Sequence, residues 1–206
     1  MKKYLAFVVL GLMATAAFAG TATTNTNTVS PTLQVQATVQ SAIRLTLSTG
    51  TAAIASHCTI NPGAGTDYSV NFGTVDALAI NAPSCGSVIA PAVPGTSDAI
   101  YWSDYNLTPV YTGQAATTNK ITAVVSANFT ASDISVVRDN ANSATVPTVA
   151  TDFTPVSTGT PDQIATNVTN GTAITRFIGV AVHPTNGAGT LTGVQNATVT
   201  FTLTVQ

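Results

Sequence analysis

The stretch Ala197-Thr198-Val199-Thr200-Phe201-Thr202-Leu203-Thr204-Val205-Gln206 decides the fold class, because apolar and polar side chains alternate along it without a break. A period of two is the pattern of a β-strand with one face buried and the other in water. Thr is β-branched, and such residues favour extended backbone. The sequence therefore predicts a half-buried strand at the end of the chain.

The same period occurs near the start of the chain, from residue 33 to residue 47. Apolar residues occupy the odd positions except at Ser41, and mostly polar residues occupy the even positions. A run of about fifteen residues is much longer than a usual strand of five or six. It predicts either one long strand that bends or two strand segments with a switch near Ser41.

Between these ends the chain contains shorter candidate strands separated by turns rich in Gly, Pro and Asn. The predicted strands span residues 68–72, 107–111, 121–129, 134–137 and 176–182. Two stretches without clear periodicity, 83–97 and 139–172, are predicted to be long loops. Many short strands joined by turns indicate an all-β fold, and we expect an immunoglobulin-like antiparallel β-sandwich with Greek-key-like connections.

The N-terminus has the features of a cleavable secretory signal peptide. Lys2 and Lys3 precede the apolar run 5–13, and Ala17-Phe18-Ala19 is an acceptable cleavage site. The apolar run is short for a membrane-spanning helix, which needs about 20 residues. We therefore expect a signal peptide over 1–19, a flexible extension over 20–32 and a single β-sandwich domain over 33–206, with no membrane span after cleavage.

Composition and charge narrow the classes of partner. The chain has six basic and eight acidic residues, and loss of Lys2 and Lys3 with the signal leaves four against eight, a net charge of −4. So few cations cannot neutralise a row of phosphates, which excludes a typical nucleic-acid-binding protein. All the acids are Asp, and roughly one residue in five is Thr, which disfavours long helices and favours strands and turns.

Two cysteines, Cys58 and Cys85, remain in a chain expected to be exported. In an oxidising compartment an even count favours a disulfide between them, and two free thiols are the alternative. His57 lies beside Cys58, but one histidine and a disulfide-bonded cysteine make neither a metal site nor a nucleophile. His183 precedes Pro184 in a predicted turn and is expected to face solvent.

Signatures of catalysis are lacking in the sequence. It contains no G-x-S-x-G elbow, no H-E-x-x-H helix, no phosphate-binding glycine loop and no Glu. We therefore predict no catalytic residue, no metal site and no cofactor, and a protein that is not an enzyme. A hydrolase with an unrecognised Asp-based site is the least favoured alternative.

One cluster of aromatic residues could serve binding. Two interpretations apply to it: a platform on which carbohydrate rings stack, and packing in the core or at a sheet edge, which we favour. The cluster consists of Tyr101, Trp102, Tyr105 and Tyr111.

The order of these features resembles that of bacterial chaperone–usher pilins and of the related spore-coat-U-like secreted subunits. The features are the signal peptide, the alternating N-terminal strand, Cys58, the segment Phe72-Gly73-Thr74-Val75, Cys85 and the alternating strand at the end of the chain. The resemblance implies an incomplete immunoglobulin-like sandwich, a pair formed by the two cysteines, and an N-terminal extension that completes a neighbouring subunit. It also implies a periplasmic chaperone and an outer-membrane usher as partners.

These observations predict a secreted structural subunit of a bacterial surface fibre, pilus or coat, which passes through the periplasm and assembles with itself or with other surface subunits. A donor strand would use the apolar residues Val29, Leu33, Val35, Ala37 and Val39. The alternative for this segment is the first strand of a self-complete domain. The alternative function is a secreted adhesive or carbohydrate-binding β-sandwich module.

Overall fold

The computed structural model describes residues 36–37, 42–61, 68–112, 119–140, 145–184 and 193–205. The chain divides into two units, Met1–Gln40 and Ser41–Gln206, and all the described strands belong to the second. The predicted signal peptide and extension lie outside the described residues. So do four of the five donor-strand candidates, namely Val29, Leu33, Val35 and Val39. The fifth, Ala37, is exposed and outside any strand.

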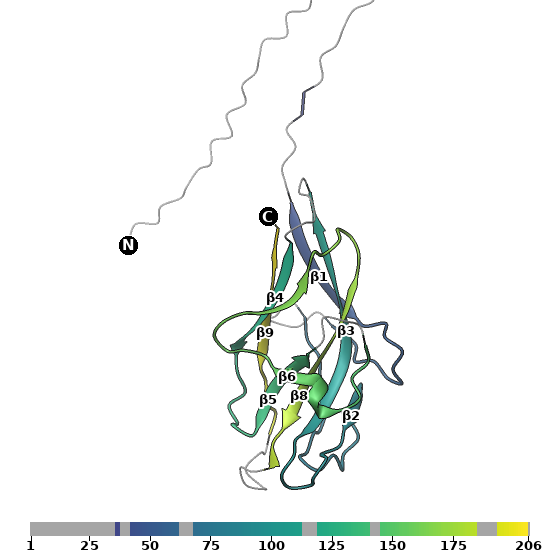
Figure 1. The fold of residues 1–206 in the computed structure, drawn as a ribbon, viewed down its shortest axis with the longest axis vertical. Coiled ribbons are helices and arrows are strands. Elements are labelled where there is room, and N and C mark those ends of the chain that lie inside the picture. The colour runs from purple at the N-terminus through teal and green to yellow at the C-terminus, as the bar shows by residue number, and fades with distance from the viewer. Residues whose placement is uncertain are drawn as a thin grey trace, which may run out of the picture. The chain divides into compact units, whose positions relative to one another are not determined.

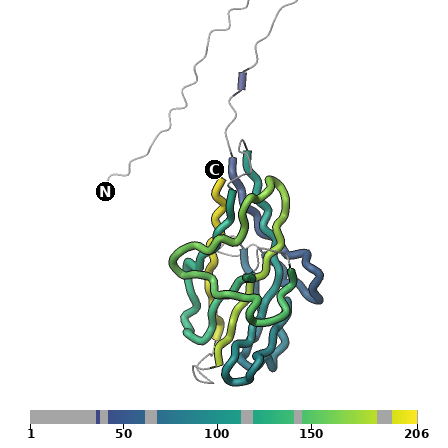
Figure 2. The backbone as a smooth tube through the Cα atoms, in the orientation of Figure 1, coloured from purple at the N-terminus to yellow at the C-terminus, as the bar shows by residue number. Residues whose placement is uncertain are grey.

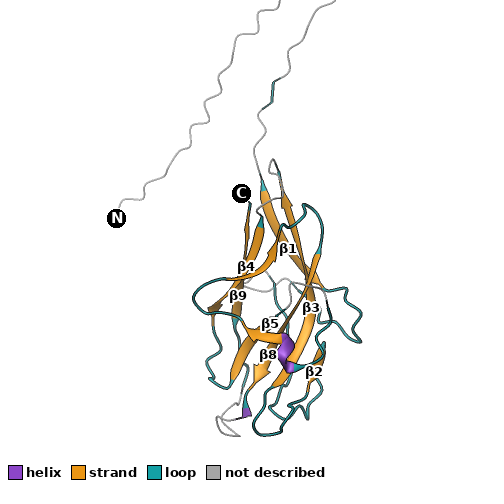
Figure 3. Ribbon diagram, viewed as in Figure 1, coloured by secondary structure: helices purple, strands orange, loops and turns teal. Residues whose placement is uncertain are grey.

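The second unit is all-β and consists of two antiparallel sheets (Figures 1 and 3). The larger sheet has the order β1-β3-β8-β5-β6, with β2 also paired to β3, and the smaller sheet has the order β7-β4-β9. Helix is limited in the described residues to short 3-10 turns such as η1 (Ala150–Asp152), and none of the described helices is long and apolar enough to cross a membrane. The strands are β1 (Ile43–Thr49), β2 (Ser87–Ile89), β3 (Ala99–Tyr111), β4 (Lys120–Ala127), β5 (Ile134–Asp139), β6 (Phe153–Pro155), β7 (Asp162–Thr166), β8 (Ile174–Val182) and β9 (Thr198–Thr204).

The period-two segments became strands close to where the sequence predicts them. β9 lies within the alternating stretch 197–205, and β4, β5 and β8 match the predictions for 121–129, 134–137 and 176–182 to within two or three residues. The prediction for 33–47 is confirmed for its last part, because β1 begins at Ile43. β4 and β9 have apolar side chains at every second position, and the buried face of a sheet requires that spacing, whereas β8 is apolar on both faces from Phe177 to Val182.

β3 is the central strand, and it is longer than the predicted 107–111. It pairs with β8 on one side, and on the other side with β2 at one end and β1 at the other. Its odd-numbered residues, such as Tyr105 and Leu107, join the core between the two sheets. Its even-numbered residues Ile100 and Trp102 join a second cluster on the outer face. Both faces of β3 are therefore covered. A strand buried on both faces does not alternate apolar with polar residues, so its sequence lacks the pattern that predicts a strand.

The two predicted loops contain short strands, so these predictions were wrong in part. The stretch 83–97 includes β2, and the stretch 139–172 includes η1, β6 and β7. Conversely, 68–72 does not form a strand. Among the described residues its backbone forms an isolated bridge between Asn61 and Ser69, and the carbonyl of Phe72 accepts the backbone N–H of Ser84. Strands of three to five residues are too short to show a period, and they form because neighbouring strands supply the hydrogen bonds.

Candidate functional site

The core-facing side chains of the edge strand β9 are incompletely buried. Val199, Phe201 and Leu203 lie opposite the buried β4 residues Val125, Ala123 and Ile121 on the inner face of the smaller sheet. The three β4 side chains are 0–5% exposed, whereas the three β9 side chains facing the same core are only partly buried. Among the described strands β9 pairs with β4 alone, so its second edge carries no ladder.

The opposite edge of the same sheet is closed. β7 is also an edge strand, yet its Ile164 and Ala165 are 3% and 5% exposed. Val156 and Val168 belong to the same buried cluster and cover this side. Position at an edge therefore does not by itself explain the exposure of β9, whose outer edge is not paired with any described strand.

The edge strand β1 of the larger sheet contacts β9 (Figures 1 and 2). Leu45 and Leu47 face the core but are only partly buried. Ile43 has the same parity and is 59% exposed, although its cross-strand partner Tyr111 is 3% exposed. We define the open edge as Ile43, Leu45 and Leu47 of β1 together with Val199, Phe201 and Leu203 of β9.

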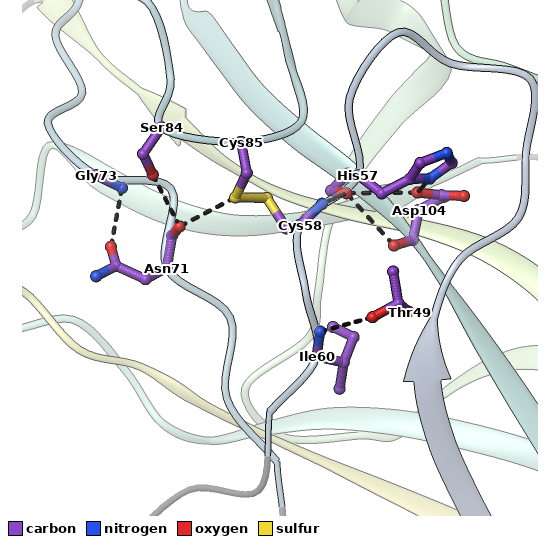
Figure 4. The surroundings of a disulfide bond; sticks show 10 residues. Thr49, His57, Cys58, Ile60, Asn71, Gly73, Ser84, Cys85 and Asp104 are labelled. Atoms are coloured by element: carbon purple, nitrogen blue, oxygen red, sulfur yellow. Dashed lines mark hydrogen bonds and ion pairs between the residues drawn. A yellow bond between two sulfur atoms is a disulfide. The ribbon is translucent and has the colours of Figure 1, made fainter.

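The predicted disulfide between Cys58 and Cys85 is present, so the alternative of free thiols is excluded (Figure 4). Cys58 is fully buried beside Phe72 and Tyr101, and its backbone N–H donates to the Ser103 hydroxyl at 2.9 Å. The bridge joins two segments without regular strands and holds them against β3. It therefore adds a covalent link between segments whose described residues form no regular ladder.

His57 is anchored beside the disulfide by a buried carboxylate. Its Nδ1 lies 2.7 Å from Oδ1 of Asp104, whose side chain is inaccessible to solvent (Figure 4). The other oxygen of Asp104 accepts the backbone N–H of Ala52 at 2.8 Å. A Cβ at Gly50 would overlap this carboxylate, so the close approach requires glycine at that position. The aspartate thus fixes the ring of a histidine that is itself 33% exposed.

A polar pocket of about 380 Å³ adjoins this pair and the disulfide. Its lining includes His57 and Cys85, and its other lining residues carry hydroxyl or amide side chains. They are Ser56, Thr59, Asn61, Ser69, Asn71 and Ser84. The described part of the chain holds no group of three or more His, Cys, Asp or Glu side chains arranged for a metal ion. The hydroxyl, amide and imidazole side chains of the lining can form hydrogen bonds with a polar molecule.

The four aromatic residues of the predicted cluster all lie in β3 and are buried. Tyr101, Trp102, Tyr105 and Tyr111 are 0–4% exposed. Trp102 contacts Phe177 and Phe153, the Tyr105 ring contacts the Phe201 ring at 5.5 Å, and the Tyr111 hydroxyl donates to the carbonyl of Val168. The ligand-facing interpretation was therefore wrong, and the rings pack in the core.

Comparison of the chain with protein-family models, with curated proteins and with solved structures found no match.

Proposed function

We propose that this protein is a secreted structural subunit of a bacterial surface fibre, pilus or coat, assembled by addition of a donor strand from one copy to the open edge of the next. The observation that carries the proposal is the contrast between the two edges of the smaller sheet. Ile164 and Ala165 of β7 are buried, whereas Val199, Phe201 and Leu203 of β9 are only partly buried. In this proposal the sandwich is an immunoglobulin-like one that lacks a strand.

The open edge offers what strand addition needs. An edge strand presents unpaired backbone N–H and C=O groups, and a peptide that pairs with them gains a hydrogen-bonded ladder. The apolar side chains of Phe201, Leu203 and Leu45 beside this edge would gain cover. Complete burial of one such side chain is worth about 1.5–3 kcal/mol, so covering several of them adds substantially to the affinity.

The proposed occupant is the segment of residues 29–39 from a second copy. Its alternating apolar residues Val29, Leu33, Val35, Ala37 and Val39 would enter the core, and Gln34, Gln36 and Thr38 would face solvent. Each subunit would accept one strand and donate another. Head-to-tail addition of this kind does not close on itself and produces a fibre. Export through the periplasm with a chaperone and an usher is part of the same proposal.

The test is polymerisation of the mature protein, followed by electron microscopy and light scattering. Val35→Asp places a charge on the face that enters the neighbour, and fibre formation should be lost. Gln36→Asp adds the same charge one residue further on, to the outward face, and should still form fibres. Removal of residues 20–40 should leave a folded monomer, and a truncated protein that still polymerises would rule out the donor strand.

A second candidate function is a secreted adhesive or carbohydrate-binding module, and the polar pocket beside the disulfide favours it. Hydroxyl and amide side chains with an anchored imidazole can form hydrogen bonds with the hydroxyls of a sugar. Calorimetry with a panel of polysaccharides should then show binding that His57→Ala and Asn71→Ala abolish. If none of the polysaccharides gives a heat of binding, the carbohydrate-binding function is ruled out and fibre assembly remains the proposed function. Neither candidate requires a catalytic residue or a cofactor.

A further inference from the structure

A serine, a histidine and an aspartate lie in a row across three neighbouring strands at one end of the larger sheet. Asp98 immediately precedes β3, His183 immediately follows β8, and Ser135 is the second residue of β5. The register explains the row, because Ala99 and Ile134 both pair with Val182, one residue before His183. The backbone N–H of His183 also donates to the carbonyl of Asp133 at 2.7 Å, which fixes the end of the strand.

The hydrogen bonds of the row follow the order of a serine nucleophile, its base and the group that orients the base. Nδ1 of His183 lies 2.6 Å from Oδ1 of Asp98, and Nε2 lies 3.3 Å from Oγ of Ser135. A carboxylate only accepts hydrogen bonds, so it selects the tautomer with the proton on Nδ1. Nε2 is then free to accept the proton of the serine hydroxyl, as a general base must.

The row is open to solvent. The side chains of His183 and Asp98 are 32% and 37% exposed, and Ser135 is partly buried. His183 was predicted to be a solvent-facing turn residue. In the structure it is partly exposed, and its ring contacts two side chains, those of Asp98 and Ser135. An electrophile from solution can therefore reach a serine that already has its base in place.

The other histidine provides an internal contrast. His57 has the same Nδ1 contact with an aspartate, Asp104, at 2.7 Å. The neighbouring Ser103 hydroxyl, however, contacts Asp104 and accepts the N–H of Cys58. Within the described residues no serine hydroxyl is bonded to His57. Of the two His–Asp pairs, only His183–Asp98 is placed to activate a serine.

We propose that Ser135, His183 and Asp98 form a nucleophilic serine site that hydrolyses carboxylic esters with good leaving groups. Such esters suit an exposed site, because their carbonyl carbons are reactive enough to need little stabilisation of the tetrahedral intermediate. The site lies on residues that the proposed assembly does not use, and it stands independently of that function.

The reaction proceeds through an acyl-serine. Oγ of Ser135 attacks the ester carbonyl carbon while its proton passes to Nε2 of His183, and Asp98 stabilises the resulting imidazolium. The bond to the leaving oxygen then breaks, and the alcohol departs with the proton from Nε2. Water attacks the acyl-serine and gives its proton to His183, which returns it to Oγ. The net reaction converts one ester and one water into an acid and an alcohol.

The test uses the full protein with two probes, a fluorophosphonate and p-nitrophenyl acetate. Peptide mapping should find the phosphonyl group on Ser135, and Ser135→Ala should abolish both this label and the site-dependent release of p-nitrophenol. His183→Asn should slow labelling by about 100-fold or more, since a general base supplies at least that factor. Asp98→Asn should also slow labelling, because an asparagine side chain no longer holds the proton of His183 on Nδ1.

Ser126 is the matched control, because it is an exposed serine on β4 whose hydroxyl contacts Thr198 and Thr200 instead of a histidine. It should stay unlabelled under conditions that modify Ser135. Three results would overturn the proposal: a wild-type protein unlabelled at Ser135, equal labelling of Ser126, or a His183→Asn variant that reacts at the wild-type rate. Circular dichroism of each variant separates a loss of reactivity from a loss of fold.

Discussion

The carboxylate of Asp76 organises the loop of residues 76–81 by itself. It accepts the backbone N–H groups of Leu78, Ile80 and Asn81, and the Tyr101 hydroxyl also donates to it. Partial burial raises the pKa of Asp76, but these hydrogen bonds outweigh it and hold the pKa below its ordinary value. Ionised Asp76 therefore ties an exposed loop to the buried ring of Tyr101.

The lowered pKa gives this contact a pH dependence of definite sign. A depressed carboxyl pKa contributes stability above the pKa of the unfolded chain, about 3.9, and the contribution is lost as pH falls through the folded value. We expect Asp76→Asn to lower the free energy of unfolding by about 1–2 kcal/mol at pH 7. Urea denaturation should show that the difference in unfolding free energy between the wild type and the variant becomes smaller below about pH 4. A difference that stays constant down to pH 2 would contradict the stabilising role of ionised Asp76.

The disulfide is the second residue-scale feature with a measurable effect. Cys58 and Cys85 are 27 residues apart, and closing a loop of that length stabilises a folded protein by about 3–4 kcal/mol in the chain-entropy model. The double variant Cys58→Ala, Cys85→Ala should lose at least this much in guanidinium denaturation. Adding reductant should destabilise the wild type by a comparable amount and leave the double variant unchanged. Reductant that shifts both equally would argue against the bridge as the cause.

At the scale of elements, Arg176 connects strands of both sheets. It lies on β8, its guanidinium pairs with Asp139 at the end of β5 at 3.2 Å, and it donates to the carbonyl of Ile164 on β7. The pair is buried, with side chains 4% and 6% exposed. Burial raises the pKa of Asp139, and the charge of Arg176 opposes this shift only in part. The arginine is thus the main compensation for a carboxylate inside the core.

Removing one member of a buried pair leaves an uncompensated charge. Arg176→Met should therefore destabilise the protein by about 3–5 kcal/mol at pH 7. Arg138→Met is the matched control, because Arg138 pairs with Asp162 at 3.5 Å nearer the surface and should cost about 1 kcal/mol or less. Thermal denaturation measures both. The stability lost in Arg176→Met should become smaller at low pH, where Asp139 is protonated. Equal losses of stability in the two variants would contradict the difference expected between the buried pair and the pair nearer the surface.

At the scale of the whole molecule, the open edge predicts that a monomer is stabilised by a strand supplied from outside. A synthetic peptide of residues 29–39 should raise the unfolding temperature of the protein lacking residues 20–40. At a free concentration of 100 times its Kd, the gain should be about 2.7 kcal/mol. The same peptide with Leu33→Asp and Val35→Asp is the control and should have no effect. Stabilisation by both peptides would show that the effect is not strand addition into the core.

The sequence by itself determined the all-β class, the cysteine pair and the strands whose residues alternate, such as β4 and β9. The class and the strands follow from local spacing, and the cysteine pair follows from the redox chemistry of the compartment to which the chain is predicted to be exported, so these properties need no knowledge of neighbours. The immunoglobulin-like topology, secretion and assembly stay predictions.

Only the tertiary structure decided which strands are central and which are edges. Tyr101 and Trp102 gave no strand signal because both faces of β3 are covered, and Phe201 shows the same alternation whether or not its edge is closed. The Ser135–His183–Asp98 row joins residues 48 and 85 positions apart in the chain. Antiparallel pairing of β3, β8 and β5 brings them together, and a pairing register depends on contacts that no local pattern records.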